Sequence, residues 1–182
     1  MVNSPHVRLQ ESSVNGYRCA TDPGEPGKKE GRLSINDAEG HILEYLVGGR
    51  TVLEIGTGLG VSTRYMAKSA KLVITCDIDP WVQENIWPDL QRLPNVTTTK
   101  DLNNLGRQFD VVFIDGCHKY GACMDDITNT RQLLKSDGFY LLHDFYQGDV
   151  KKAIIDAKLF WTLIETWAGI AIAWQLKPRK EF

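Results

Sequence analysis

Short apolar or β-branched runs alternate with amphipathic segments along most of this chain of 182 residues. Five runs have the length and composition of buried strands: Thr51–Ile55, Leu72–Cys76, Val96–Thr99, Val111–Ile114 and Phe139–Leu142. Around them, apolar residues recur at helical spacing in five segments: 35–47, 61–68, 81–86, 120–134 and 150–157. Strands separated by helices form βαβ units, so the pattern predicts a mostly parallel α/β sheet.

Two helix boundaries are predicted from capping residues. Ser34, followed by Asp37 at the third helical position, is expected to cap the first helix. Asp79-Pro80 is expected to cap a short helix that Pro88 stops.

The most apolar stretch of the chain, Leu159–Leu176, predicts two buried strands rather than a bilayer helix. It contains Glu165 and divides at Trp167-Ala168-Gly169. The link between strands 160–164 and 170–175 is too short for a crossover, so that pair must be antiparallel. We therefore expect a Rossmann-like, doubly wound, mostly parallel seven-stranded sheet with a C-terminal antiparallel hairpin.

Residues 1–31 differ from the rest of the chain. The segment from Asp22 to Gly31 is dense in turn-forming and charged residues. We expect 1–31 to be a flexible arm and 32–182 to be the folded domain. The arm would either close over a binding site or pair with a second subunit in a homodimer.

Charge and cysteine usage restrict the class of protein. The chain has 21 Lys and Arg against 23 Asp and Glu, so no basic excess favours binding to a nucleic acid. Its four cysteines lack metal-binding or CxxC spacing, which favours free thiols in a reducing compartment. The first ten residues lack the apolar run of a signal peptide. We expect a cytoplasmic protein that binds neither nucleic acid nor membrane.

A glycine turn joins the first predicted strand to the next helix, with the sequence E-I-G-T-G-L-G over 54–60. Glycines at such a junction let the backbone turn sharply and approach a ligand. The third glycine of a dinucleotide fingerprint would stand at position 61, which is Val61, so an NAD-dependent oxidoreductase is disfavoured. Glu54 at the strand end suits a ligand with a cationic amino group.

Two further acids follow the second and third strands. Asp77 lies about 20 residues after the turn, where a carboxylate reaches ribose hydroxyls in a doubly wound fold. Asp101 follows the third strand. Together they indicate a nucleoside that carries a positive charge, although a glycine turn alone often only packs a helix on a sheet.

With these residues, the chain from Ser34 to Gln175 resembles the class I S-adenosylmethionine-dependent methyltransferases. The resemblance implies that the glycine turn wraps the methionine part of the cofactor, that Asp77 holds the ribose hydroxyls and that Ile78 packs on the adenine. Asp101 and Leu102 would meet the adenine edge. The implied cofactor-binding residues are Glu54, Gly56, Thr57, Gly58, Gly60, Asp77, Ile78, Asp101, Leu102 and Asp115.

Polar residues also follow the fourth and fifth strands. Asp115 and His118 come after the fourth strand, and His143-Asp144 after the fifth. Neighbouring parallel strands would place Asp115 beside His143-Asp144, where two carboxylates repel each other unless a cation lies between them. We therefore expect Asp115, His143 and Asp144 to bind a divalent cation such as Mg²⁺.

The segment I-D-G-C-H-K-Y over 114–120, followed by His143-Asp144, resembles small O-methyltransferases of the catechol type and relatives acting on sugars and antibiotic scaffolds. Asp115 matches the metal-binding aspartate, and His118 stands where the catechol pattern has a lysine base. The resemblance implies transfer of a methyl group from S-adenosylmethionine to a hydroxyl of a small molecule. Asp115 and His118 are the expected catalytic residues, since the pKa of histidine suits a base at neutral pH.

Other functions and roles remain open from the sequence. The chain would also fit a catalytically silent S-adenosylmethionine-binding partner module. His118 would also fit a surface loop residue, or one that only orients Asp115. His143 is as well suited to a structural hydrogen bond as to a metal.

Overall fold

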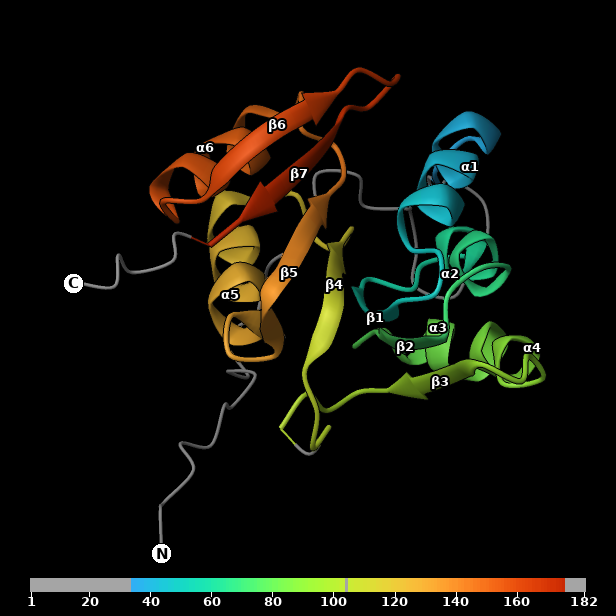
Figure 1. Ribbon diagram of the computed structural model, residues 1–182. Coiled ribbons are helices and arrows are strands. Elements are labelled where there is room, and N and C mark those ends of the chain that lie inside the picture. The colour runs from blue at the N-terminus through green and yellow to red at the C-terminus, as the bar shows by residue number, and fades with distance from the viewer. Residues whose placement is uncertain (1–33, 104, 176–182) are drawn as a thin grey trace, which may run out of the picture.

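The computed structural model describes residues 34–103 and 105–175, so the predicted arm over 1–31 lies outside the described residues. One seven-stranded sheet forms the centre, with helices on both faces (Figure 1). The strands are β1 (Thr51–Ile55), β2 (Leu72–Cys76), β3 (Val96–Thr99), β4 (Phe109–Ile114), β5 (Leu134–Leu142), β6 (Phe160–Ile164) and β7 (Ile170–Trp174). The helices are α1 (Asp37–Leu46), α2 (Val61–Ala67), α3 (Pro80–Asn85), α4 (Trp87–Leu90), α5 (Tyr120–Thr130) and α6 (Gly148–Asp156).

The strand order confirms the predicted topology. It is β3-β2-β1-β4-β5-β7-β6, with β1 to β5 parallel and β7 antiparallel to both β5 and β6. The chain moves outward from β1 to β3 and then returns to place β4 on the other side of β1. Ligands of open α/β sheets bind at such a reversal, beyond the carboxyl ends of the strands.

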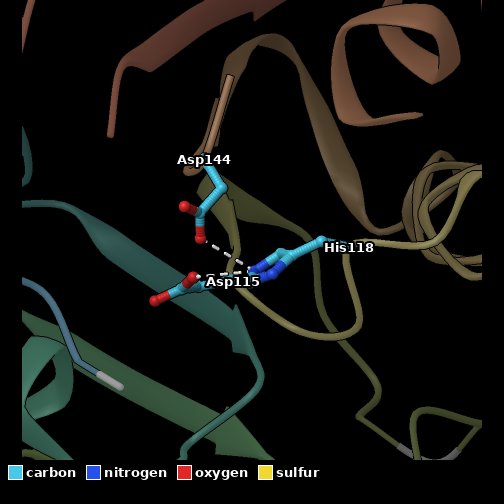
Figure 2. A group of neighbouring side chains, drawn as sticks. All are labelled: Asp115, His118 and Asp144. Atoms are coloured by element: carbon cyan, nitrogen blue, oxygen red, sulfur yellow. Dashed lines mark ion pairs between the residues drawn. The ribbon is translucent and has the colours of Figure 1, made fainter. Parts of the chain in front are cut away.

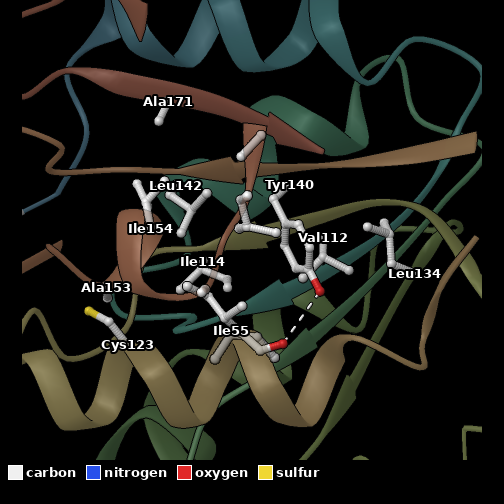
Figure 3. Close-up of a cluster of buried hydrophobic side chains, with 14 of the residues drawn as sticks. Ile55, Val112, Ile114, Cys123, Leu134, Tyr140, Leu142, Ala153, Ile154 and Ala171 are labelled. Atoms are coloured by element: carbon white, nitrogen blue, oxygen red, sulfur yellow. Dashed lines mark hydrogen bonds between the residues drawn. The ribbon is translucent and has the colours of Figure 1, made fainter. Parts of the chain in front are cut away.

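Helices cover each face of the sheet because apolar side chains of the strands point both ways. Under α5 and α6, the core includes Ile114, Tyr140 and Leu142; Tyr140 is fully buried and donates a hydrogen bond to the carbonyl of Ile127 (3.4 Å; Figure 3). On the other face, α1, α2 and α4 pack on Val52, Val111 and neighbouring residues. Among the described helices, none has the length and apolarity that a bilayer crossing requires.

The predicted Asp79-Pro80 cap is confirmed, since Asp79 caps α3 and its side chain accepts the N–H of Trp81 (2.8 Å). The predicted cap of the first helix and the predicted role of Pro88 are wrong. Asn36, not Ser34, caps α1: its side chain accepts the N–H of Glu39, and Glu39 in return accepts the N–H of Asn36. Pro88 does not end the helical region but lies in the first turn of α4, where the missing N–H of proline is tolerated.

The segment predicted as a long helix over 120–134 also differs. Helix α5 ends at Thr130, and β5 already begins at Leu134 because this residue pairs with Phe109 before a register irregularity. Of the two C-terminal strands predicted to be buried, only β7 is. Strand β6 forms the sheet edge, where Phe160 is 59% exposed.

Candidate active site

The carboxyl ends of β1 and β4 approach each other closely at Gly56. Its φ is +94°, and a Cβ there would lie 2.4 Å from the carbonyl oxygen of Asp115. The N–H of Asp115 donates to the carbonyl of Ile55 (2.9 Å). Only glycine permits this backbone conformation and contact without strain, so Gly56 determines where Asp115 lies.

The glycine-turn edge comprises residues 56–60, Asp77 and Asp101, at the ends of β1, β2 and β3. Asp77 bridges this edge: one carboxylate oxygen accepts the N–H of Gly58 (3.0 Å) and the other that of Asp79 (2.9 Å). Burial raises the pKa of Asp77. Gly58 (φ +51°) borders open space, and Ile78 is 51% exposed. An exposed apolar side chain beside an acid at this edge fits the predicted adenosine site.

Two residues predicted to bind the cofactor instead have internal partners. Glu54 is fully buried and accepts hydrogen bonds from the hydroxyls of Ser62 and Thr63, so it ties α2 to β1. Burial raises the pKa of Glu54 to about 7. The hydroxyl of Thr57 is also buried, 2.7 Å from that of Thr75. Their side chains therefore shape the turn from inside.

The remaining cofactor residues predicted from the sequence lie at the same edge. Gly60 is the left-handed residue before α2 (φ +70°). Asp101 accepts hydrogen bonds from the backbone and side-chain N–H groups of Asn103 (both 2.8 Å). Leu102 is 3% exposed and belongs to the core under α5, so its side chain packs beneath the glycine-turn edge, inside the protein.

The β4–β5 edge comprises Asp115, His118, His143 and Asp144, at the ends of those two strands. Pairing of Ile114 with Leu142 brings Asp115 beside His143, as predicted. The Nε2 of His118 lies 2.9 Å from Asp144 Oδ2 and 3.6 Å from Asp115 Oδ1 (Figure 2).

The three residues in Figure 2 are placed so that they could hold a cation. One ligand atom from each of Asp115, His118 and Asp144 lies within 4.8 Å of the other two. The opposite ring nitrogen of His118 lies 3.2 Å from the side-chain amide of Gln147, which fixes the ring. Two carboxylates and one imidazole suit a divalent cation of the first transition series as well as Mg²⁺.

His143 lies beside the two aspartates as predicted, but carboxylates face both of its ring nitrogens. Its Nδ1 lies 3.1 Å from an oxygen of both Asp115 and Asp144, and its Nε2 lies 3.3 Å from Glu39 Oε2. Burial alone would lower the pKa of His143, but hydrogen bonds with the two aspartates raise it to about 10. Since both ring nitrogens face carboxylates, His118 replaces His143 in the expected metal set.

The two aspartates are ionised at neutral pH. Burial alone would raise the pKa of Asp115 and of Asp144, but hydrogen bonds with His118 and His143 hold both below the ordinary value. Asp144 also has a left-handed backbone (φ +56°), a conformation that few residues other than glycine adopt and that clusters at functional sites.

Sequence reasoning missed two residues that contact the histidines of this edge, Glu39 and Gln147. The spacing N-D-A-E over 36–39 could have located Glu39, because a glutamate three residues after an asparagine is a capping box. Nothing in the pattern around Gln147 indicates its contact with His118.

The fold agrees with comparisons to known proteins. A family model described as "Methyltransferase domain" matches residues 53–145, which is just over half of the chain. The chain belongs to this methyltransferase family. The predicted resemblance is thereby confirmed, although no curated protein matches the sequence significantly.

Solved structures share the fold of this methyltransferase. Cofactor-bound Rv0187 from MTB is 25% identical, with a TM-score of 0.67 over 79% of this chain and 82% of that one. An O-methyltransferase from Bacillus cereus in complex with SAH is 18% identical (TM-score 0.66; 77% and 81% covered). TomG, an O-methyltransferase from Streptomyces achromogenes in complex with SAM, is 17% identical (TM-score 0.65; 78% and 81% covered).

Proposed function

We propose that this methyltransferase transfers the methyl group of S-adenosylmethionine to a hydroxyl oxygen of a small molecule. One observation carries the proposal: the acid-and-imidazole group of the β4–β5 edge directly adjoins the glycine-turn edge through the contact of Gly56 with Asp115. A cofactor at the first edge would therefore present its sulfonium near the second. Two proteins that share the fold, the Bacillus cereus O-methyltransferase in complex with SAH and TomG in complex with SAM, support this assignment.

The chemistry needs alignment and removal of one proton. The S–CH₃ bond breaks, the O–CH₃ bond forms, and the sulfur keeps the electron pair as the thioether of S-adenosylhomocysteine. Such an in-line displacement is accelerated mainly by holding the acceptor oxygen in line with the methyl carbon and the sulfur of the donor. We assign the proton of the acceptor hydroxyl to the imidazole of His118, which lies in the acid-and-imidazole group with its Nε2 2.9 Å from Asp144 Oδ2.

Asp115, Asp144 and His118 would hold a divalent cation, since their ligand atoms converge. When bound, such an ion lowers the pKa of a hydroxyl and orients it. His118 would then be a ligand rather than the base. If exhaustive chelation abolishes activity and Mn²⁺ or Mg²⁺ restores it, His118 is a metal ligand. If activity survives chelation, His118 is the base that accepts the proton of the hydroxyl.

Cofactor binding is tested by calorimetry with S-adenosylhomocysteine. The Asp77→Ala variant should bind at least about tenfold more weakly than the wild type, because a charged hydrogen-bond acceptor contributes about 1.5–3 kcal/mol. Asp89→Ala is the matched control, since Asp89 is an exposed acid on α4 paired with Arg92. Equal affinity of the Asp77 variant and the wild type would refute the assignment.

Methyl transfer is tested with labelled S-adenosylmethionine and a panel of phenolic, sugar and other small hydroxylated acceptors. Label transferred by the wild type and lost in His118→Asn supports the proposed enzyme. Tight cofactor binding without transfer to any acceptor would favour a silent binding module instead.

A further inference from the structure

Glu39 is a fully buried acid on α1 whose two oxygens face different parts of the molecule. Oε1 accepts hydrogen bonds from the hydroxyl of Thr166 (2.8 Å) and the N–H of Ala168 (3.1 Å), in the turn between β6 and β7. Oε2 accepts the N–H of Asn36 (3.1 Å) and lies 3.3 Å from Nε2 of His143.

Capping alone does not require this arrangement. A capping glutamate at the third helical position needs only one oxygen, for the N–H of the cap. Burying a carboxylate is costly unless charges and hydrogen bonds compensate it. Although burial alone would raise the pKa of Glu39, its bonds with Thr166, Ala168 and Asn36 and the charge of His143 lower it.

His143 connects Glu39 to the β4–β5 edge. Its Nε2 is buried and makes no hydrogen bond within the described part of the chain, so the Glu39 carboxylate is the group that offsets its burial. Its Nδ1 lies 3.1 Å from both Asp115 and Asp144. A tilt of the ring would therefore move its contacts with both aspartates.

We infer that Glu39 is a positioning residue of the active site: it fixes the imidazole of His143, which fixes the carboxylates of Asp115 and Asp144. The inference rests on the proposed function of that edge. Partners that orient ligating groups in this way typically change metal affinity or activity by about 10- to 100-fold when they are removed.

A merely structural role of Glu39 would act through its other oxygen. The turn that Oε1 holds also accepts N–H groups from the segment after Asp144: Gly169 accepts that of Phe145, and Ala168 that of Tyr146. Loss of the turn would therefore disturb the fold near the site. Thr166→Val removes a bond to Oε1 and leaves the His143 side intact, which makes it the matched control for Glu39→Gln.

The test measures Mn²⁺ affinity by water-proton relaxation and the ¹H–¹⁵N resonances of the His143 ring. Glu39→Gln should lower Mn²⁺ affinity about tenfold and shift the ring resonances, whereas Thr166→Val should change affinity less than twofold and leave the resonances in place. In a His143→Asn background, Glu39→Gln should have less than a twofold further effect, because the route through His143 is already broken.

Three results would overturn the inference: unchanged His143 resonances in Glu39→Gln, an equal change in Thr166→Val, or the full loss of affinity in the His143→Asn background. If Glu39→Gln does not fold, Glu39→Asp, which keeps the charge and shortens the reach, should show the same shifts. Glu39→Gln should bind S-adenosylhomocysteine with wild-type affinity. If the wild type itself does not bind S-adenosylhomocysteine, that result contradicts the proposed function but not the inference about Glu39. If the wild type does not bind Mn²⁺, the ring resonances alone decide.

Discussion

The glycine-turn edge and the β4–β5 edge use their acidic side chains in different ways. At the first, Asp77 and Asp101 accept N–H groups of their own loops, with Asp77 also reaching Gly58. At the second, Asp115 and Asp144 face imidazoles, and no such backbone N–H partner for their carboxylates is found among the described residues.

The difference indicates that the first edge serves cofactor binding and the second serves the reaction. Acids that brace a backbone turn shape a binding surface, and the exposed side chain of Ile78 lies beside it. Acids that share imidazoles hold charge and protons where a reaction takes place. Substitutions at the first edge should therefore change cofactor affinity, and substitutions at the second should change turnover.

The largest effect should come from Gly56→Ala, which breaks the contact between the two edges. The new Cβ would meet the backbone of Asp115 at 2.4 Å with φ at +94°, so we expect a loss of about 3 kcal/mol in unfolding free energy and loss of both cofactor binding and turnover. Gly58→Ala, with open space around it, should cost only about 1 kcal/mol. Urea unfolding of both variants checks this; equal losses would contradict it.

A second substitution should separate the edges. His118→Asn should slow methyl transfer by about 100-fold or more, because it removes either the base or a metal ligand. Its affinity for S-adenosylhomocysteine should stay within twofold of the wild type. Steady-state rates with an acceptor found by screening, together with calorimetry, provide the measurement, and a parallel loss of affinity would show that the edges are not separable.

Glu54 should make stability depend on pH. Its pKa is raised by burial from 4.5 to about 7, so the stability that its neutral form contributes is present below pH 4.5 and lost as pH rises through 7. Two and a half pH units correspond to about 3 kcal/mol. Glu54→Gln should flatten the urea-derived stability profile between pH 5 and 8 relative to the wild type. Asp126, with its pKa also raised by burial to about 7, stays in both proteins and cancels in the comparison.

The smallest effect should come from Ile78→Ala. Since half of this side chain is exposed, the unfolding free energy should change by less than about 0.5 kcal/mol. If Ile78 packs on adenine as proposed, its removal should weaken the binding of S-adenosylhomocysteine about fivefold, near 1 kcal/mol. Unchanged affinity would mean that the adenine lies elsewhere.

The fold was predictable because its signals are local. Apolar runs such as Val111–Ile114 and the short link before Ile170 determine parallel units and an antiparallel hairpin without knowledge of distant contacts. That β6 is an exposed edge was not predictable, because its burial depends on which strand lies beyond it.

The site was predictable where the parallel pairing of two strands alone determines which residues lie side by side, as for Asp115 and His143. It was not predictable where side chains meet across the whole chain. Glu39 and Thr166 are 127 residues apart, and the burial of Glu54 depends on how α2 lies on β1. The role of His143 between two carboxylates likewise follows only from three-dimensional packing.

One calorimetric comparison tests the division between the edges most directly. S-adenosylhomocysteine is titrated into the wild type, Asp77→Ala and Asp144→Asn under identical conditions. We predict that Asp77→Ala loses about tenfold or more in affinity while Asp144→Asn stays within twofold of the wild type. Wild-type affinity in Asp77→Ala, or an equal loss in both variants, would contradict the account.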